Sequence, residues 1–152
     1  MYLLDTTHCS RLLDADGGII KKLEELNDIP VKTCVIVKGE LVCMAVRSQR
    51  KEENERKVAN FLNDIEVLPV DSKAAEEYGI IKNAVLTKHG PKRKTTKRKT
   101  TLRSIGLSDN DLWIAAIAKR HNLTVVSGDG DFSRIKEAVP LSLENWKDQS
   151  ES

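Results

Sequence analysis

The sequence of 152 residues lacks any long apolar run and any leader-like start. Its longest apolar stretch, Leu112 to Ala118, is far shorter than the roughly 20 residues that a membrane-spanning helix needs. Met1 is followed by a short apolar run that ends at Asp5, so both the basic region and the apolar core of a signal peptide are missing. We therefore expect a cytoplasmic protein without membrane contacts.

Cysteine is also scarce, and the three cysteines form no bridging or metal-binding pattern. Their number is odd and no two have C-x-x-C spacing, which argues against a disulfide framework. A domain of this length buries roughly 70% of the surface that its unfolded chain exposes, so it needs no covalent staple. We expect all three to be reduced core residues: Cys9, Cys34 and Cys43.

Acidic residues are absent from one stretch, Lys88 to Arg103, which holds eight basic residues. The formal net charge is nevertheless only +2, because the rest of the chain holds 17 basic and 23 acidic residues. A mildly acidic body therefore carries one concentrated cationic segment. Gly90-Pro91 ends the preceding helical pattern, and the Lys/Thr-rich residues up to Thr101 have no apolar periodicity, which predicts a loop or arm.

Short apolar or β-branched runs, typical of buried strands, alternate with helical patterns along the chain. This order predicts an α/β fold in which helices cover both faces of a central, mostly parallel sheet. Neither repeats nor a second domain are evident, so we expect one domain over residues 1–148, a basic insertion at about 88–104 and a polar tail over 149–152. Strands are expected at Tyr2 to Leu4, Thr33 to Val37, Glu66 to Val70 and Thr124 to Ser127, and helices around Ile19 to Leu26, over Lys38 to Leu62 as one long or two successive helices, over Ala74 to Thr87 and from Asp111.

Four acidic residues are placed where an open α/β sheet binds ligands, outside the carboxyl ends of its strands. Asp5 directly follows the first predicted strand and Glu40 lies three residues beyond the second. Asp129 lies two residues beyond the last strand, and Asp111 opens the helix that precedes that strand. We expect these four side chains to meet at one edge of the sheet.

Carboxylates that are brought together repel one another, and a hard cation relieves the repulsion. Mg²⁺ and Mn²⁺ prefer all-oxygen ligands, whereas zinc favours histidine and cysteine. The three histidines are scattered along the chain, so we assign no catalytic role to His8, His89 or His121. The sequence therefore predicts a Mg²⁺ or Mn²⁺ site.

Each acid also has a structural interpretation. Asp5 is suited to cap a helix that starts at Thr7. Ser108 and Asp111 have the spacing of a capping box, in which Asp111 would accept a hydrogen bond from the Ser108 backbone. Asp109 is expected to be a cap and Asp131 to support the ligands or the turn. Trp113 and Tyr78 lie at helical spacing, where aromatic residues are more often core or interface residues than base-stacking platforms.

The residues around these acids resemble the PIN-domain ribonucleases, and within them the VapC-type toxins of bacterial toxin–antitoxin pairs. The resemblance covers nearly the whole chain. It departs from the family at Thr7, where an Asn is usual, and at Val37-Lys38-Gly39, where many members have Ser or Thr before the Glu. The similar segments are Tyr2-Leu3-Leu4-Asp5-Thr6, Val35 to Leu41, Asn110-Asp111-Leu112-Trp113-Ile114-Ala115-Ala116, Thr124 to Phe132 and Glu144-Asn145-Trp146.

The resemblance implies a PIN fold, a homodimer, hydrolysis of RNA such as transfer RNA, and inhibition by a VapB-type antitoxin. Asp5 and Asp111 would be the principal metal ligands, with Glu40 and Asp129 binding directly or through water. The hydroxyls of Thr6 and Ser127 would orient the carboxylates. The residues expected to contact RNA phosphates are Lys92, Arg93, Lys94, Lys97, Arg98 and Lys99.

Other interpretations stay open at this point. Ser127 to Asp131 resembles the late acidic motif of haloacid-dehalogenase-like phosphatases, although that family needs an acid at the position of Thr7. A PIN-like scaffold that binds RNA without cutting it is a further alternative. For the basic segment, the alternatives to RNA contact are a solubilising loop and contact with an acidic stretch of an antitoxin.

Overall fold

The computed structural model describes residues 1–93 and 99–147. Within these residues the strands form one parallel sheet in the order β3-β2-β1-β4-β5. This confirms the predicted α/β class. The strands are β1 (Tyr2–Leu4), β2 (Val31–Cys34), β3 (Glu66–Leu68), β4 (Thr124–Val126) and β5 (Leu143–Glu144).

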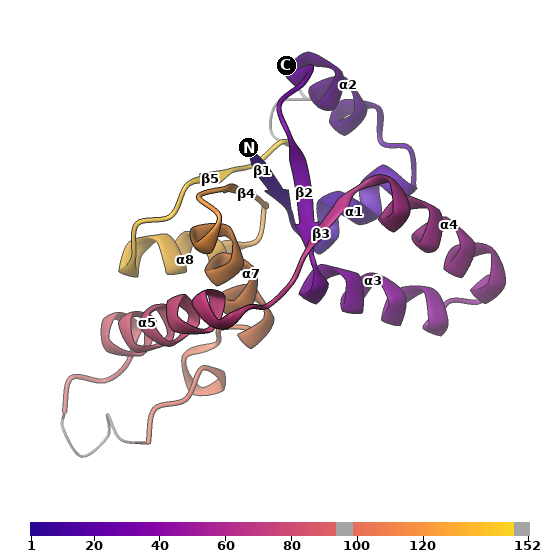
Figure 1. The fold of residues 1–152 in the computed structure, drawn as a ribbon. Helices are drawn as coiled ribbons and strands as arrows, with labels where there is room; N and C mark the ends of the chain where they lie inside the picture. Colours follow the sequence, from indigo (N-terminus) through magenta and orange to yellow (C-terminus); the bar gives the residue numbers. More distant parts are fainter. Residues whose placement is uncertain (94–98, 148–152) are drawn as a thin grey trace.

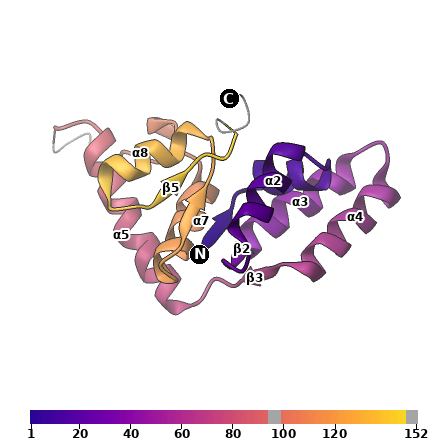
Figure 2. The ribbon, with the colours of Figure 1, turned by 90° about the horizontal axis from the view of Figure 1, so that it is seen from above.

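The helices fall into two groups on opposite sides of this sheet, as Figures 1 and 2 show. From β1 to β3 the sheet grows in one direction, and right-handed crossovers place the helices of these connections on one face. From β4 to β5 the sheet grows in the opposite direction from β1, so the same handedness places the later helices on the other face. The first group is α1 (Thr6–Leu13), α2 (Gly17–Leu26), α3 (Val35–Arg47) and α4 (Lys51–Asp64). The second is α5 (Ser72–His89), the 3₁₀ turn η1 (Arg103–Ile105), α7 (Asp109–Arg120) and α8 (Gly130–Ala138).

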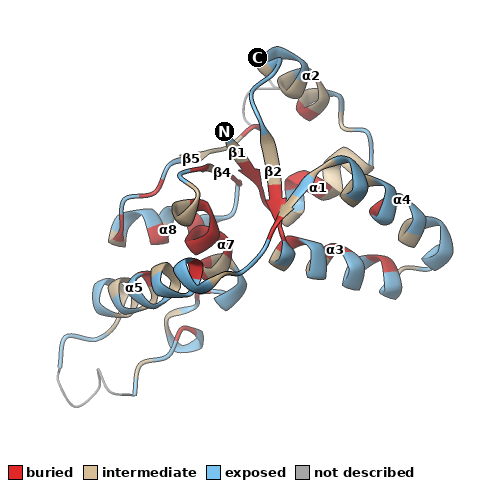
Figure 3. Cartoon of the chain, viewed as in Figure 1, coloured by how far each residue is buried: buried red, intermediate tan, exposed pale blue. Residues whose placement is uncertain are grey.

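Strands β1 and β4 lie at the centre of the sheet and are the most deeply buried (Figure 3). Leu4 pairs with Val126, and neither side chain is exposed. Helix α7 packs its residues 112 and 114–118 into the same core. The strand order reverses between β1 and β4, so their carboxyl ends form the switch point at which such sheets bind ligands.

The second strand is shorter than predicted, and the residues assigned to its end form the first turn of α3. Val35 to Val37 are β-branched or aliphatic, which favours a strand. Val37, Leu41 and Ala45 are nevertheless all buried, and their spacing of four residues is that of a helix face. Burial of this helical stripe outweighs local strand propensity, and Glu40 consequently lies in the second turn of a helix.

Most of the other predicted elements are present, but α8 has no counterpart among the predicted helices. The region from Lys38 to Leu62 contains two helices, separated at Ser48–Arg50, where the Ser48 hydroxyl donates to the Ala45 carbonyl. Strand β3 ends at Leu68, two residues earlier than predicted, and strand β4 ends at Val126, one residue earlier than predicted.

One prediction about the cysteines was wrong. Cys9 and Cys34 are buried and free, as expected, and burial raises the pKa of the Cys9 thiol to about 12. Cys43 is free but exposed, because it lies outside the stripe of α3 that faces the core. None of the helices in the described part of the chain has the length and apolar character needed to cross a bilayer.

Candidate metal centre

Asp5 stands at the carboxyl end of β1, against the end of β4. Its backbone N–H donates to the Val126 carbonyl at 3.1 Å, and the residue is only 5% exposed. One carboxylate oxygen, Oδ1, accepts hydrogen bonds from the backbone N–H of His8 and from Nδ1 of the same residue, both at 2.8 Å. Asp5 therefore caps α1, and it also faces the switch point of the sheet.

Glu40 approaches the same edge from α3, and hydrogen bonds hold both of its oxygens. The Thr6 hydroxyl donates to Oε2 at 2.8 Å, and the Asn110 side-chain amide donates to Oε1 at 3.2 Å. These two contacts connect α3 to α1 and to α7. They fix the orientation of the carboxylate, and no ion pair with Glu40 is present within residues 1–93 and 99–147.

Asp111, Asp129 and Asp131 form the tightest acidic group in the described residues. One oxygen of each carboxylate lies within 4.8 Å of the others. Asp111 is in the first turn of α7, Asp129 is the N-cap of α8, and Asp131 is in the first turn of α8. The Asp129 carboxylate accepts a hydrogen bond from the Asp131 backbone N–H at 2.9 Å.

The capping-box interpretation of Asp111 was wrong. The backbone N–H of Ser108 donates at 3.0 Å to Oδ2 of Asp131, which comes from another helix, and the Ser108 side chain makes no capping hydrogen bond. Because Asp131 caps α7 across the tertiary structure, the Asp111 carboxyl is directed to its acidic neighbours instead.

The protonation of Asp111 reflects this crowding. Burial contributes most, followed by a hydrogen bond with Asp131 and by the charges of Asp129, Asp131 and Glu40, and together they raise the pKa of Asp111 to about 8. Near neutral pH the group therefore shares a proton with its neighbours unless another positive charge is supplied. A divalent cation supplies that charge, and the oxygen donors fit Mg²⁺ or Mn²⁺.

The structure thus arranges the predicted acids in two halves. We call Asp5 and Glu40 the braced half, because hydrogen-bond donors hold their carboxylates. We call Asp111, Asp129 and Asp131 the crowded half, because one oxygen of each carboxylate lies close to the other two and the charges of Asp129 and Asp131 act on Asp111. Sequence reasoning placed Asp131 outside the ligand set, although its oxygen is as close to the cluster as those of the other two.

Other predicted residues have more modest positions. The Ser127 hydroxyl accepts a hydrogen bond from the backbone N–H of Asp129 at 3.0 Å, so it orders the turn rather than contacting a carboxylate directly. Trp113 stacks on Tyr78 with ring centroids 3.8 Å apart, and the Tyr78 hydroxyl donates to Asp109. These aromatic residues join α5 to α7.

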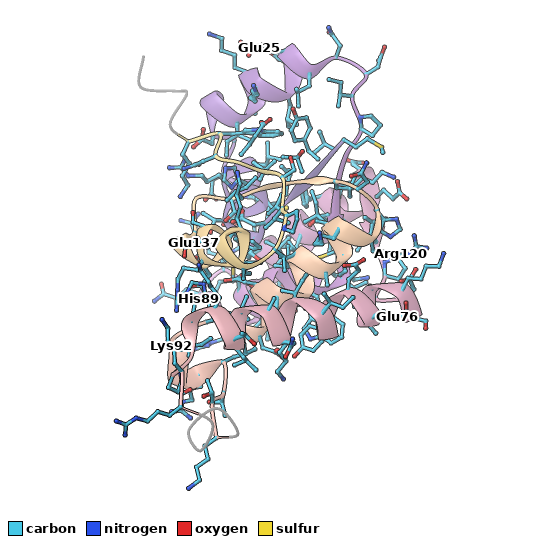
Figure 4. The ribbon with its side chains drawn as sticks, turned by 90° about the vertical axis from the view of Figure 1, so that its left-hand side faces the viewer. Glu25, Glu76, His89, Lys92, Arg120 and Glu137 are labelled. Atoms are coloured by element: carbon cyan, nitrogen blue, oxygen red, sulfur yellow. The ribbon has the colours of Figure 1, made fainter. Side chains whose placement is uncertain are left out.

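The basic segment begins where α5 ends. Figure 4 shows His89 and Lys92 at one end of this helix, near Glu137 of α8. Nε2 of His89 contacts the carbonyl of Arg134 at 2.9 Å, which anchors that end of α5 to α8. Of the predicted RNA contacts, the structure describes Lys92, Arg93 and Lys99, whereas Lys94, Lys97 and Arg98 lie outside the described residues, as does the expected tail over 149–152.

Two residues that support the acids were not identified from sequence. His8 contacts Asp5 directly, and its position three residues after an N-cap was a usable signal, because that spacing brings the side chains together in the first helical turn. Asn110 carried no such signal, since its partner Glu40 is 70 residues away along the chain.

Comparison with known proteins agrees with this geometry. Residues 2–138 match the PIN domain family. Ribonuclease VapC2 of Haemophilus influenzae is 32% identical over 148 residues, which cover 95% of this chain and 97% of that protein. Ribonuclease VapC2 of Rickettsia felis is 27% identical over 151 residues, covering 96% and 98%.

The crystal structure of VapBC2 from Rickettsia felis, bound to a DNA fragment from its promoter, superposes with a TM-score of 0.77 at 27% identity and covers 95% of this chain and 98% of that one. The chain therefore belongs to the PIN-domain family. Within that family its relatives are VapC ribonucleases. This membership removes the phosphatase alternative.

Proposed function

We propose that this protein is a divalent-metal-dependent endoribonuclease that acts as the toxin of a toxin–antitoxin pair. The observation that carries the proposal is the meeting of acidic side chains at the β1/β4 switch point, in a chain that aligns end to end with VapC ribonucleases. Inhibition of translation through RNA cleavage is the expected cellular effect.

Asp5, Glu40, Asp111 and Asp129 are the proposed ligands, and Asp131 is a further candidate because one of its carboxylate oxygens lies within 4.8 Å of oxygens of Asp111 and Asp129. A divalent ion at such a site lowers the pKa of an attacking water and neutralises charge on the phosphate. Thr6 and Asn110 hold Glu40, and His8 holds Asp5. Because this chemistry uses water as the nucleophile, the protein needs no side chain that attacks the phosphate.

The test is cleavage of total cellular RNA by the purified protein with Mg²⁺ or Mn²⁺. Discrete fragments that disappear with EDTA and with Asp111→Asn would support the proposal. Asp109→Asn is a matched control, because Asp109 is in the same helical turn but bonds to Tyr78 instead of the acidic cluster. Tight RNA binding without cleavage under either metal would favour the non-cutting scaffold.

For the basic segment we propose contact with the phosphates of the RNA. Lys92, Arg93 and Lys99 continue from the end of α5, and the proposal extends to Lys94, Lys97 and Arg98. Neutralising several phosphates makes binding fall steeply with salt. Deletion of residues 92–99 should weaken RNA binding and flatten its salt dependence, whereas a change only in antitoxin affinity would assign the segment to the antitoxin.

We also propose a homodimer with a VapB-type antitoxin as partner and transfer RNA as a substrate. The antitoxin is supported by the superposed Rickettsia structure, which is a VapBC2 complex, whereas the dimer and the transfer RNA substrate rest on the family resemblance alone. Light scattering of the purified chain tests the dimer, and sequencing of the cleavage products tests the substrate.

A further inference from the structure

The side chain of His8 is fully buried, and its ring makes a hydrogen bond with the carboxylate of Asp5. Nδ1 of its ring lies 2.8 Å from Oδ1 of Asp5. Since a carboxylate oxygen only accepts hydrogen bonds, the ring must carry its hydrogen on Nδ1 to make this contact. A buried polar ring in this position needs a reason beyond filling space, because an apolar side chain would fill it at lower cost.

The surroundings of the other ring nitrogen indicate which tautomer His8 adopts. Nε2 of His8 is buried and has no hydrogen-bond partner among the described residues. The indole of Trp146 stands edge-on to the imidazole, with centroids 6.3 Å apart and an interplanar angle of 88°. An N–H at Nε2 would be an unsatisfied donor in these surroundings, which favours the tautomer that donates to Asp5.

The contact restricts the Asp5 carboxylate. Oδ1 accepts from both the backbone and the ring of His8, so rotation of the carboxylate would break two hydrogen bonds. We propose that His8 is a positioning residue: it holds the Asp5 carboxylate in one orientation and keeps Oδ2 available to bind the divalent ion. This inference rests on the proposed function, because it assumes that Asp5 is a metal ligand.

Two substitutions separate positioning from packing. His8→Asn keeps a donor, because the amide nitrogen of Asn is as many bonds from Cα as Nδ1 of His, but it leaves part of the ring volume empty and buries an amide oxygen that needs a donor. His8→Leu fills a similar volume without any donor. Positioning therefore predicts that His8→Asn retains metal affinity at a cost in stability, while His8→Leu loses metal affinity with little loss of stability.

The experiment is Mn²⁺ titration of the purified full-length variants by calorimetry, with thermal unfolding measured in EDTA. We expect the dissociation constant for Mn²⁺ to rise about 10- to 100-fold in His8→Leu, the range found when groups that orient ligands are removed. His8→Asn should stay close to wild type. His121→Leu is a matched control, because His121 also has a buried Nε2 without a partner among the described residues but carries no proposed role in the site.

Equal losses of affinity in His8→Leu and His8→Asn, or no loss in His8→Leu, would overturn the inference. If His8→Leu does not fold, His8→Met removes the donor with a side chain that adapts to irregular space, and the same criteria apply. Asp5→Asn separates the two levels of the proposal. Weaker Mn²⁺ binding in Asp5→Asn with unchanged binding in His8→Leu refutes only the role of His8, whereas unchanged binding in Asp5→Asn removes Asp5 from the ligand set and the inference with it.

Discussion

The braced half and the crowded half of the acidic site treat their carboxylates in opposite ways. In the braced half, Asp5 and Glu40 receive hydrogen bonds from His8, Thr6 and Asn110. These donors hold the two carboxylates in fixed orientations. In the crowded half, the neighbours of Asp111 are themselves acids, and they raise its pKa.

This difference suggests that the two halves contribute to ion binding in different ways. The braced half supplies ligands in a fixed orientation, which reduces the cost of ordering them when the ion binds. The crowded half supplies an unfavourable concentration of negative charge that a cation relieves. Crowding should therefore contribute affinity for the ion through its negative charge, whereas bracing should contribute affinity through the fixed orientation of the ligands.

The largest expected effect is loss of cleavage when either half loses a ligand. Asp5→Asn and Asp111→Asn should each lower the rate of RNA cleavage by more than about 100-fold, because even residues that only orient ligands cost 10- to 100-fold. Single-turnover cleavage of a fixed RNA substrate measures this. A variant of one half that retains most of the activity would show that the site lies wholly in the other half.

The second prediction concerns stability and pH, and its sign follows from the raised pKa of Asp111. The folded protein binds the Asp111 proton more tightly than the unfolded chain does, since the pKa rises from 3.8 to about 8 on folding. The contribution of this group to the free energy of unfolding is therefore greatest in acid and is lost as the pH rises from about 4 to about 8.

Asp111→Asn removes the carboxyl group whose ionisation destabilises the folded protein at higher pH. In EDTA at pH 8 the variant should be more stable than wild type by about 1–2 kcal/mol, less than the full shift implies because the carboxyl is partly exposed to water. The advantage should shrink at pH 5, where wild-type Asp111 is protonated. Urea unfolding at the two pH values measures it, and an advantage independent of pH would contradict the assigned cause.

Asp5 provides a contrasting case, because its carboxylate caps α1 by accepting hydrogen bonds. Asp5→Ala should lower the free energy of unfolding by about 0.5–2 kcal/mol, the usual cost of losing a helix N-cap. The same urea experiments apply. If Asp5→Ala were as stabilising as Asp111→Asn, the distinction between the two halves would be wrong.

The sequence was sufficient to predict the sheet edge at which the acids meet, because the residue that follows a buried strand is set by the backbone. Asp5 and Asp129 follow neighbouring parallel strands, so chain order and the handedness of crossovers place both residues beyond the same edge of the sheet. The start of α3 was not predictable from local propensity, since burial of Val37 and Leu41 on a helix face determined it.

The division into two halves depends on tertiary contacts that have no local signal. Thr6 and Glu40 are 34 residues apart, and Asp131 reaches Ser108 across 23 residues. Which donor meets which carboxylate depends on how α3, α7 and α8 pack, and periodicity does not specify that packing. For this reason the acids were found from sequence, but their hydrogen-bond partners were mostly not.

A smaller effect is expected when the side chains that donate hydrogen bonds to Glu40 are removed. Asn110→Ala and Thr6→Val should each lower cleavage about 10-fold and leave stability nearly unchanged, because Asn110 is exposed and Thr6 is only half-buried. Thr7→Val is a matched control on the exposed side of the same turn. Cleavage that falls equally in the control would indicate a general disturbance of α1.

The smallest effect should come from Ser127, which supports the crowded half through the backbone alone. Its buried hydroxyl accepts from the Asp129 backbone N–H, and Ser127→Ala removes that acceptor. Because Asp129 is exposed, water can replace the lost bond, so we expect a loss of about 1 kcal/mol or less in stability and only about a 2- to 3-fold loss of cleavage. A loss as large as that of Asn110→Ala would mean that the crowded half also depends on fixed orientation, and that its role is geometric as well as electrostatic.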